Sequence, residues 1–186
     1  MISLILSGKS NMELGFYATG ASKRPMLPVT IDRTLVIPGT NGAYNFGADL
    51  GTRTIEYDCR FIEQDYLKLQ QVVMELAAYL LDSFGKPRTL VLQQVERPGQ
   101  SITVQYSGQI DLQRIMGTGV FNLPLLAHDP YFYSDEQLVE RSVTSSPQVI
   151  EIQSSGTIRT DPYIVFTNTG SNTINRIRLT NEVRVE

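Results

Sequence analysis

The only histidine, His128, is the side chain best suited to exchange protons near neutral pH. Its neighbour Asp129 carries a carboxylate that could orient the imidazole ring, as in a general acid or base. Pro130 follows directly, and these residue types are equally typical of a strand that ends before a proline turn. We expect the turn and no reaction.

The single cysteine, Cys59, falls on the apolar side of a predicted strand, where a thiol stays buried and protonated. A catalytic pair of cysteine and histidine is therefore not expected. One cysteine and one histidine cannot supply a zinc site, and no acidic loop has the spacing of a calcium-binding EF-hand. The sequence predicts a protein that is not an enzyme, with no catalytic residue, no metal ion and no cofactor.

Paired carboxylates are the remaining chemical possibility, because a glycoside hydrolase needs only two of them in the right geometry. Glu56, Asp58 and Asp111 could converge in space. Their positions opposite apolar residues favour a solvated strand face instead.

The run Ser7-Gly8-Lys9-Ser10 imitates the end of a phosphate-binding loop. The first glycine of that motif would fall at Ser3, and residues 11–20 show no helical period that could aim a helix N-terminus at a phosphate. We predict a plain turn between strands.

Apolar and polar residues alternate over residues 54–61, which predicts a strand with Ile55, Tyr57, Cys59 and Phe61 on its buried face. The apolar spacing then becomes helical over residues 65–83, with Asp65 as N-cap and a stop at Gly85 and Pro87. Further strands are predicted over residues 4–6, 16–19, 34–37, 89–95, 102–110 and 119–127, with a turn at residues 97–100. The fold class is therefore mainly β (α+β): an antiparallel, sandwich-like N-terminal domain with one packed helix.

Composition divides the chain into residues 1–135, a Ser- and Thr-rich linker over residues 136–147, and residues 148–186. The last part has strand patterns over residues 149–152, 163–167 and 174–179, which make half a sandwich at most. We expect an incomplete second β-domain.

Charge and apolar runs restrict the partners. The formal charge is −3 and the basic residues are scattered, so no stripe exists that could neutralise a run of phosphates. The apolar start over residues 2–6 is too short for a signal peptide or a membrane span. Neither nucleic acid nor membrane is a predicted partner, and a reducing cytosol is the expected place of synthesis.

The segment Arg33–Gly47 places three glycines and a proline beside two aromatic rings, Tyr44 and Phe46. Asn41-Gly42 and Gly47 are able to supply the positive φ angles of tight turns. A loop of fixed shape with two aromatic rings suits docking against another protein, although both rings could also fold into the core of the chain. We place a candidate subunit interface at Asn41, Tyr44 and Phe46.

Here the sequence resembles the N-terminal domain of siphophage distal tail proteins over about residues 16–135. The resemblance is carried by Asp32-Arg33-Thr34, Pro38-Gly39, Asn41-Gly42-Ala43-Tyr44, Phe46-Gly47, Arg53-Thr54-Ile55-Glu56, Gly108-Gln109-Ile110-Asp111-Leu112 and Asp129-Pro130-Tyr131-Phe132-Tyr133-Ser134. Residues 148–186 resemble the opening strands of the galectin-like β-sandwich that follows in this family, through Gly156-Thr157, Thr160-Asp161-Pro162 and Phe166-Thr167-Asn168-Thr169-Gly170.

The resemblance implies a structural component of a phage tail tip or baseplate, which forms a hexameric ring. The ring would join the tail tube and tape-measure proteins to the tip or baseplate proteins, in a virion assembled in the bacterial cytoplasm. The alternatives are a carbohydrate-binding β-sandwich module in host adhesion and, third, a glycoside hydrolase.

Overall fold

The alternation over residues 54–61 becomes strand β6 (Arg53–Phe61) in a computed structural model of the chain. The structure describes residues 2–115, 118–153, 156–158 and 160–182. Its internal contacts separate two units, residues 1–137 and residues 138–186, and each unit is described by itself.

Strands β6 and β10 (Thr118–Ala127) form the spine of the first unit. They pair antiparallel from Val120 opposite Arg60 to Ala127 opposite Arg53. Burial alternates along both strands, because successive side chains of a strand point to opposite faces of its sheet. The predicted inward face of β6 is confirmed, since all four of its apolar residues are at most 3% exposed.

The main sheet has the order β2-β1-β7-β8-β10-β6-β3, with β9 added beside β10 and β11 beside β8. Every pairing is antiparallel, so the predicted mainly β fold with antiparallel strands is confirmed. The remaining strands are β1 (Leu4–Leu6), β2 (Lys9–Ser10), β3 (Phe16–Ala18), β7 (Thr89–Gln94), β8 (Gln100–Tyr106), β9 (Gln113–Ile115) and β11 (Tyr133–Ser134).

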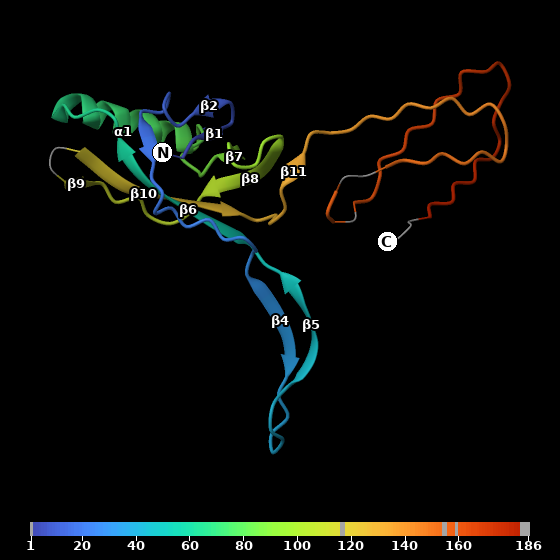
Figure 1. Cartoon of the computed structure of the whole chain (residues 1–186), viewed down its shortest axis with the longest axis horizontal. Coiled ribbons are helices and arrows are strands. Elements are labelled where there is room, and N and C mark those ends of the chain that lie inside the picture. The colour runs from blue at the N-terminus through green and yellow to red at the C-terminus, as the bar shows by residue number, and fades with distance from the viewer. Residues whose placement is uncertain (1, 116–117, 154–155, 159, 183–186) are drawn as a thin grey trace. The chain divides into compact units, whose positions relative to one another are not determined.

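Helix α1 (Tyr66–Leu80) is the single helix of the described residues, and it lies over the sheet in Figure 1. Asp65 is its N-cap, as predicted, and accepts hydrogen bonds from the backbone N–H groups of Leu67 and Lys68. The helix buries Leu69, Leu76 and Leu80 in the same core as the sheet. It ends three residues before the predicted boundary at residue 83, because residues 81–87 form a tight turn instead, in which Leu81 bridges Pro87.

The two ends of the curled sheet are joined by Asn11, which is 1% exposed. Its Oδ1 accepts a hydrogen bond from the backbone N–H of Leu4 in β1 at 3.1 Å, and its Nδ2 donates to the carbonyl of Phe16 in β3 at 3.1 Å. The backbone N–H of Ile2 also donates to the carbonyl of Ala18 at 3.0 Å. The Asn11 amide therefore replaces part of the missing ladder between β1 and β3.

The second unit differs from the sequence prediction. Residues 149–152, 163–167 and 174–179 were expected to be strands, but the described residues of this unit contain none. An isolated strand has no stability without a neighbour to accept its hydrogen bonds, and these segments form no ladder with one another. Their large apolar side chains remain exposed, as at Val149 and Tyr163.

Replacing Asn11 by leucine should lower the free energy of unfolding by roughly 3 kcal/mol, because two buried backbone groups would lose their only side-chain partner. Chemical denaturation measures this loss. Asn122→Leu, on the exposed side of β10, is the matched control and should change stability little. Equal stability of the two variants would show that Asn11 does not join the ends of the sheet.

Candidate functional site

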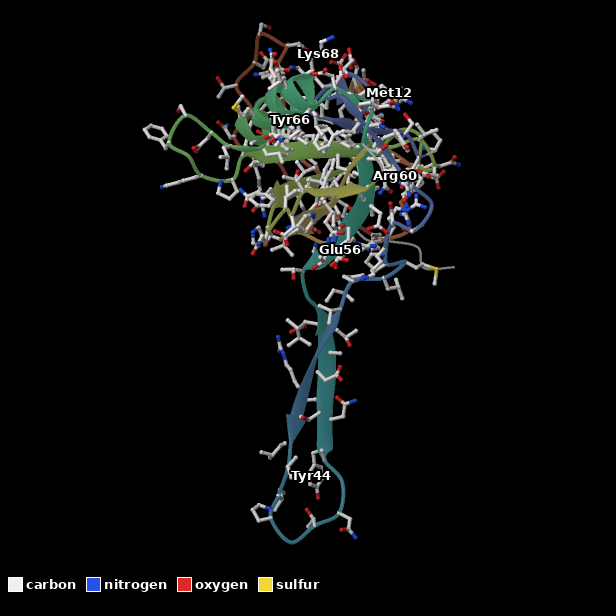
Figure 2. All side chains as sticks on the ribbon, turned by 90° about the vertical axis from the view of Figure 1, so that its left-hand side faces the viewer. Met12, Tyr44, Glu56, Arg60, Tyr66 and Lys68 are labelled. Carbon is white, nitrogen blue, oxygen red and sulfur yellow. The ribbon has the colours of Figure 1, made fainter. Side chains whose placement is uncertain are left out.

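The glycine-rich segment forms a hairpin of strands β4 (Thr30–Leu35) and β5 (Tyr44–Leu50), which constitute a separate two-stranded sheet. In Figures 1 and 2 the hairpin projects away from the main sheet, and Tyr44 lies toward its far end. A strand was predicted over residues 34–37 with a loop after it, and this prediction is wrong in extent. The strand-like alternation that begins at Tyr44 outweighs the glycines, so that residues 44–47 of the expected loop belong to β5.

A β-bulge interrupts the hairpin. Asp32 pairs with Ala48 and Thr34 pairs with Asn45, so β5 has one residue more than β4 between these two pairs. Gly47 lies in the extra stretch with a φ of +100°, which a residue with a side chain rarely adopts. The bulge exchanges the faces of β5 along its length.

One face of the hairpin is apolar near both ends. Ile31 and Leu35 have the same parity along β4, and Leu35 pairs directly with Tyr44. All three side chains are more than half exposed. An ion pair between Arg33 and Asp49 lies between them on this face. The hairpin therefore exposes large apolar side chains that no part of its own unit covers.

The predicted interface residues are distributed over the outer half of the hairpin. Tyr44 and Phe46 belong to β5 and are 58% and 67% exposed, so the alternative in which both rings fold into the core is wrong. Asn41 is exposed in the loop of residues 36–43. Gly42 adopts the predicted positive φ but Asn41 does not, because this loop is longer than the two-residue turn that needs both.

The root of the hairpin is held by Arg53, which is 7% exposed. Its Nη1 donates to the carbonyls of Pro25 at 2.8 Å and Met26 at 3.2 Å, in the segment that leads into β4. Its Nε donates to the carbonyl of Pro130 at 2.9 Å, just after β10. One guanidinium thus joins the start of the hairpin, the strand that follows it and the end of β10.

Burial lowers the pKa of Arg53 because it disfavours the charged form, and the positive charge of Arg97 acts in the same direction. Arg53 occurs in one motif of the resemblance, but the sequence predicted no structural role for it. Its parity along β6 is that of Ile55 and Tyr57, so the alternation itself marks it as an inward-facing charge that must find partners.

The residues that were considered for catalysis lie apart from one another. His128 is exposed and makes no hydrogen bond with Asp129 among the described residues. The two carboxylate oxygens of Asp129 instead accept from the backbone N–H of Tyr131 at 3.2 Å and from the hydroxyl of Tyr133 at 2.6 Å. Asp129 therefore stabilises a local turn after β10 and does not orient the imidazole.

Cys59 is fully buried in the inward face of β6. Burial raises the pKa of its thiol, and the neighbouring charge of Asp58 adds to the effect. The thiol donates to the carbonyl of Tyr57 at 3.4 Å. A protonated, enclosed thiol is a poor nucleophile and fills space in the core, as predicted.

The three candidate carboxylates are only partly brought together. Glu56 pairs with Lys23 at 3.3 Å, whereas Asp58 and Asp111 both line a shallow depression of about 450 Å³. The lining of this depression includes Arg60 and several side-chain amides, and Asp111 accepts a hydrogen bond from Gln109 at 2.6 Å. A general acid needs a carboxyl in apolar surroundings, and this open polar hollow does not provide them.

The residues that imitate a phosphate-binding loop form the turn between β1 and β2, where a plain turn was predicted. The Ser10 hydroxyl donates to Glu13 at 2.8 Å, which places a carboxylate where a phosphate would have to bind. Among the described residues, no three His, Cys, Asp or Glu side chains are grouped so as to hold a metal ion. The described helix also lacks the length and apolar character needed to cross a bilayer.

Comparison with known proteins adds two findings. Residues 11–127 match the family described as phage tail protein RIFT-related domain. The structure is similar to that of the Dit protein of phage SPP1, described as a paradigm of the hub adsorption apparatus in phages that infect Gram-positive bacteria, with a TM-score of 0.62 and 14% identity. The similarity covers 73% of this chain and 53% of the SPP1 chain, so the chain spans about half the length of that protein. A search of curated proteins found no match.

Arg53→Met should lower the free energy of unfolding by about 3 kcal/mol, because three carbonyls lose a charged donor and the methionine cannot replace it. The matched control is Arg60→Met, an exposed arginine of the same strand, which should be nearly neutral. Thermal or chemical denaturation of both variants measures the difference. If both unfold like the parent protein, Arg53 does not hold the root of the hairpin.

Cys59 should react with a thiol-specific reagent only as fast as the protein unfolds, because its thiol is buried and its pKa is raised. Labelling in native buffer at pH 8, compared with labelling in denaturant, measures the protection. Stoichiometric labelling of the folded protein within seconds would contradict the buried position.

Proposed function

The chain belongs to the family of phage tail proteins with a RIFT-related domain, and from this premise we propose that it forms a hexameric ring at the distal end of the tail. The ring joins the tail tube and the tape-measure protein on one side to the tip or baseplate proteins on the other. The chain is a component of the virion, and its assembly takes place in the cytoplasm of the bacterial host.

The similarity to SPP1 Dit supports the distal position, because that protein is described as part of a hub adsorption apparatus. The likeness covers 73% of this chain and concerns the fold, and the family match covers residues 11–127 of the first unit. We therefore assign the ring-forming role to residues 1–135 and residues 148–186, joined by the linker of residues 136–147, to a second, galectin-like domain.

A closed ring requires two different complementary surfaces on every subunit, since each contact is repeated by rotation about the axis. The projecting hairpin and the body of the first unit are two such surfaces, with different shapes and compositions. A contact of the hairpin with the body of the next subunit closes the ring when the rotation per subunit is sixty degrees.

The exposed apolar face of the hairpin is the observation that carries this proposal. A two-stranded hairpin is marginally stable by itself in water, and large apolar side chains gathered on an exposed surface mark an interaction site. Tyr44 and Phe46, with Asn41 in the tip loop, supply aromatic contact area in the outer half of the hairpin. We assign these three residues to the contact between neighbouring subunits.

The role is structural and involves no reaction. Asp129 is occupied by a local turn, Cys59 is enclosed in the core, and Glu56 is paired with Lys23. These engagements support the assignment of the chain as a building block of the tail.

The double variant Tyr44→Ala and Phe46→Ala should lose the ring while the subunit stays folded, because both side chains are exposed and contribute little to its core. Light scattering gives the mass of the assembly, and negative-stain microscopy of the parent protein should show an annulus with six-fold symmetry. Circular dichroism and the thermal midpoint report on the fold of the variant.

The matched control removes two exposed apolar side chains elsewhere on the first unit, Leu67→Ala and Phe84→Ala. This control should assemble like the parent protein. A full-sized ring from the folded Tyr44 and Phe46 variant would refute the interface, and a parent protein that is monomeric at high concentration would refute the ring.

A further inference from the structure

A second depression, of about 230 Å³, lies beside the root of the hairpin. Its lining combines three arginines with one carboxylate and one aromatic ring: Arg24, Arg53, Arg97, Glu96 and Phe132. The charged lining therefore carries an excess of two positive charges. The depression lies within the first unit and depends on no contact between subunits.

Only one of the three arginines is neutralised by its surroundings. Arg24 donates to Glu96 at 2.7 Å, and this pair accounts for the single carboxylate of the lining. Arg53 binds only backbone carbonyls, and Arg97 makes no ion pair among the described residues. The guanidinium groups of Arg53 and Arg97 thus line the depression without a carboxylate of the described residues paired to either of them.

Both unpaired guanidinium groups lie close to the ring of Phe132. The Cζ atom of Arg97 lies 4.3 Å from the ring centroid and that of Arg53 lies 5.2 Å from it. A cation within about 6 Å of a ring centroid is attracted to the face of the ring. The ring therefore attracts both guanidinium groups in the absence of a ligand.

Arg53 retains one donor group for a ligand. Its Nε and Nη1 atoms are used by the protein, whereas Nη2 has no protein acceptor among the described residues. No buried side-chain nitrogen or oxygen of the described residues lacks a partner, so Nη2 must reach the surface. The depression is the part of that surface which Arg53 lines.

Two like charges held close together at a partly enclosed site repel one another more strongly than they would in open water. An anion between them removes this repulsion, and a carboxylate matches the planar fork of a guanidinium with two parallel hydrogen bonds. We propose that this depression is a carboxylate-binding site in which Arg97 and Arg53 Nη2 are the donors. The carboxylate belongs to an aspartate, a glutamate or a chain terminus of a neighbouring protein chain in the assembled tail.

Succinate is a suitable probe, because it presents a carboxylate without a protein attached. Titration of succinate into the full chain, with ionic strength held constant by sodium chloride, should shift the Nε–H nuclear magnetic resonance signals of Arg97 and Arg53 along a saturating curve. Arg97→Gln should weaken the apparent affinity about tenfold, the effect of one charge-assisted hydrogen bond. Arg60→Gln, on the same strand as Arg53 but outside the depression, is the matched control and should bind as the parent protein does.

If a neighbouring copy in the ring already fills the depression, both measurements change. Succinate then fails to bind, and Arg97→Gln raises the protein concentration needed for ring formation, whereas Arg60→Gln leaves it unchanged. This result identifies a second copy as the source of the carboxylate, and saturable succinate binding with unchanged self-association identifies a different protein. The proposal is overturned if Arg97→Gln and Arg60→Gln behave alike both in the succinate titration and in self-association.

Discussion

The arrangement of the first unit depends on a buried positive charge that only backbone carbonyls satisfy. Arg53 takes its acceptors from Pro25, Met26 and Pro130, in segments that are far apart in the sequence. A charge of this kind is costly to bury unless it is hydrogen-bonded, so these segments are constrained to meet at one point. The hairpin leaves the body at this point, and its direction is therefore fixed by a polar contact at its base.

The first unit consists of a body with a buried apolar core and a hairpin that is exposed to solvent. The core between α1 and the curled sheet contains aliphatic and aromatic side chains, with Phe61 stacked on Phe121 at 4.5 Å. The Asn11 amide joins the ends of the sheet within this core. The hairpin has no such core. The hairpin therefore lacks the buried contacts that stabilise the body of the unit.

The periodicity of apolar residues predicted the body of the unit well and the hairpin poorly. The alternation along β6 and most strands of the body follow from side-chain spacing, because each strand buries one face on a shared core. The Asp65 cap follows from a residue type that accepts hydrogen bonds at the point where helical spacing begins. The hairpin was missed as a hairpin, since its glycines are typical of loops and its apolar residues face water. Arg53 was overlooked although its parity placed it inside. The strands expected after residue 148 failed because spacing does not reveal whether a partner strand is present.

The bulge at Gly47 decides which residues of β5 share a face. The faces of a strand alternate with a period of two, and Tyr44 and Asp49 are an odd number of positions apart, yet the bulge places both on the face of Ile31 and Leu35. Deleting Gly47 would remove the bulge, and Tyr44 would stay opposite Leu35 while Asp49 stays opposite Ile31. Because a bulge bends its strand and increases the local twist, loss of this residue would change the course of the hairpin and keep its apolar residues on one face.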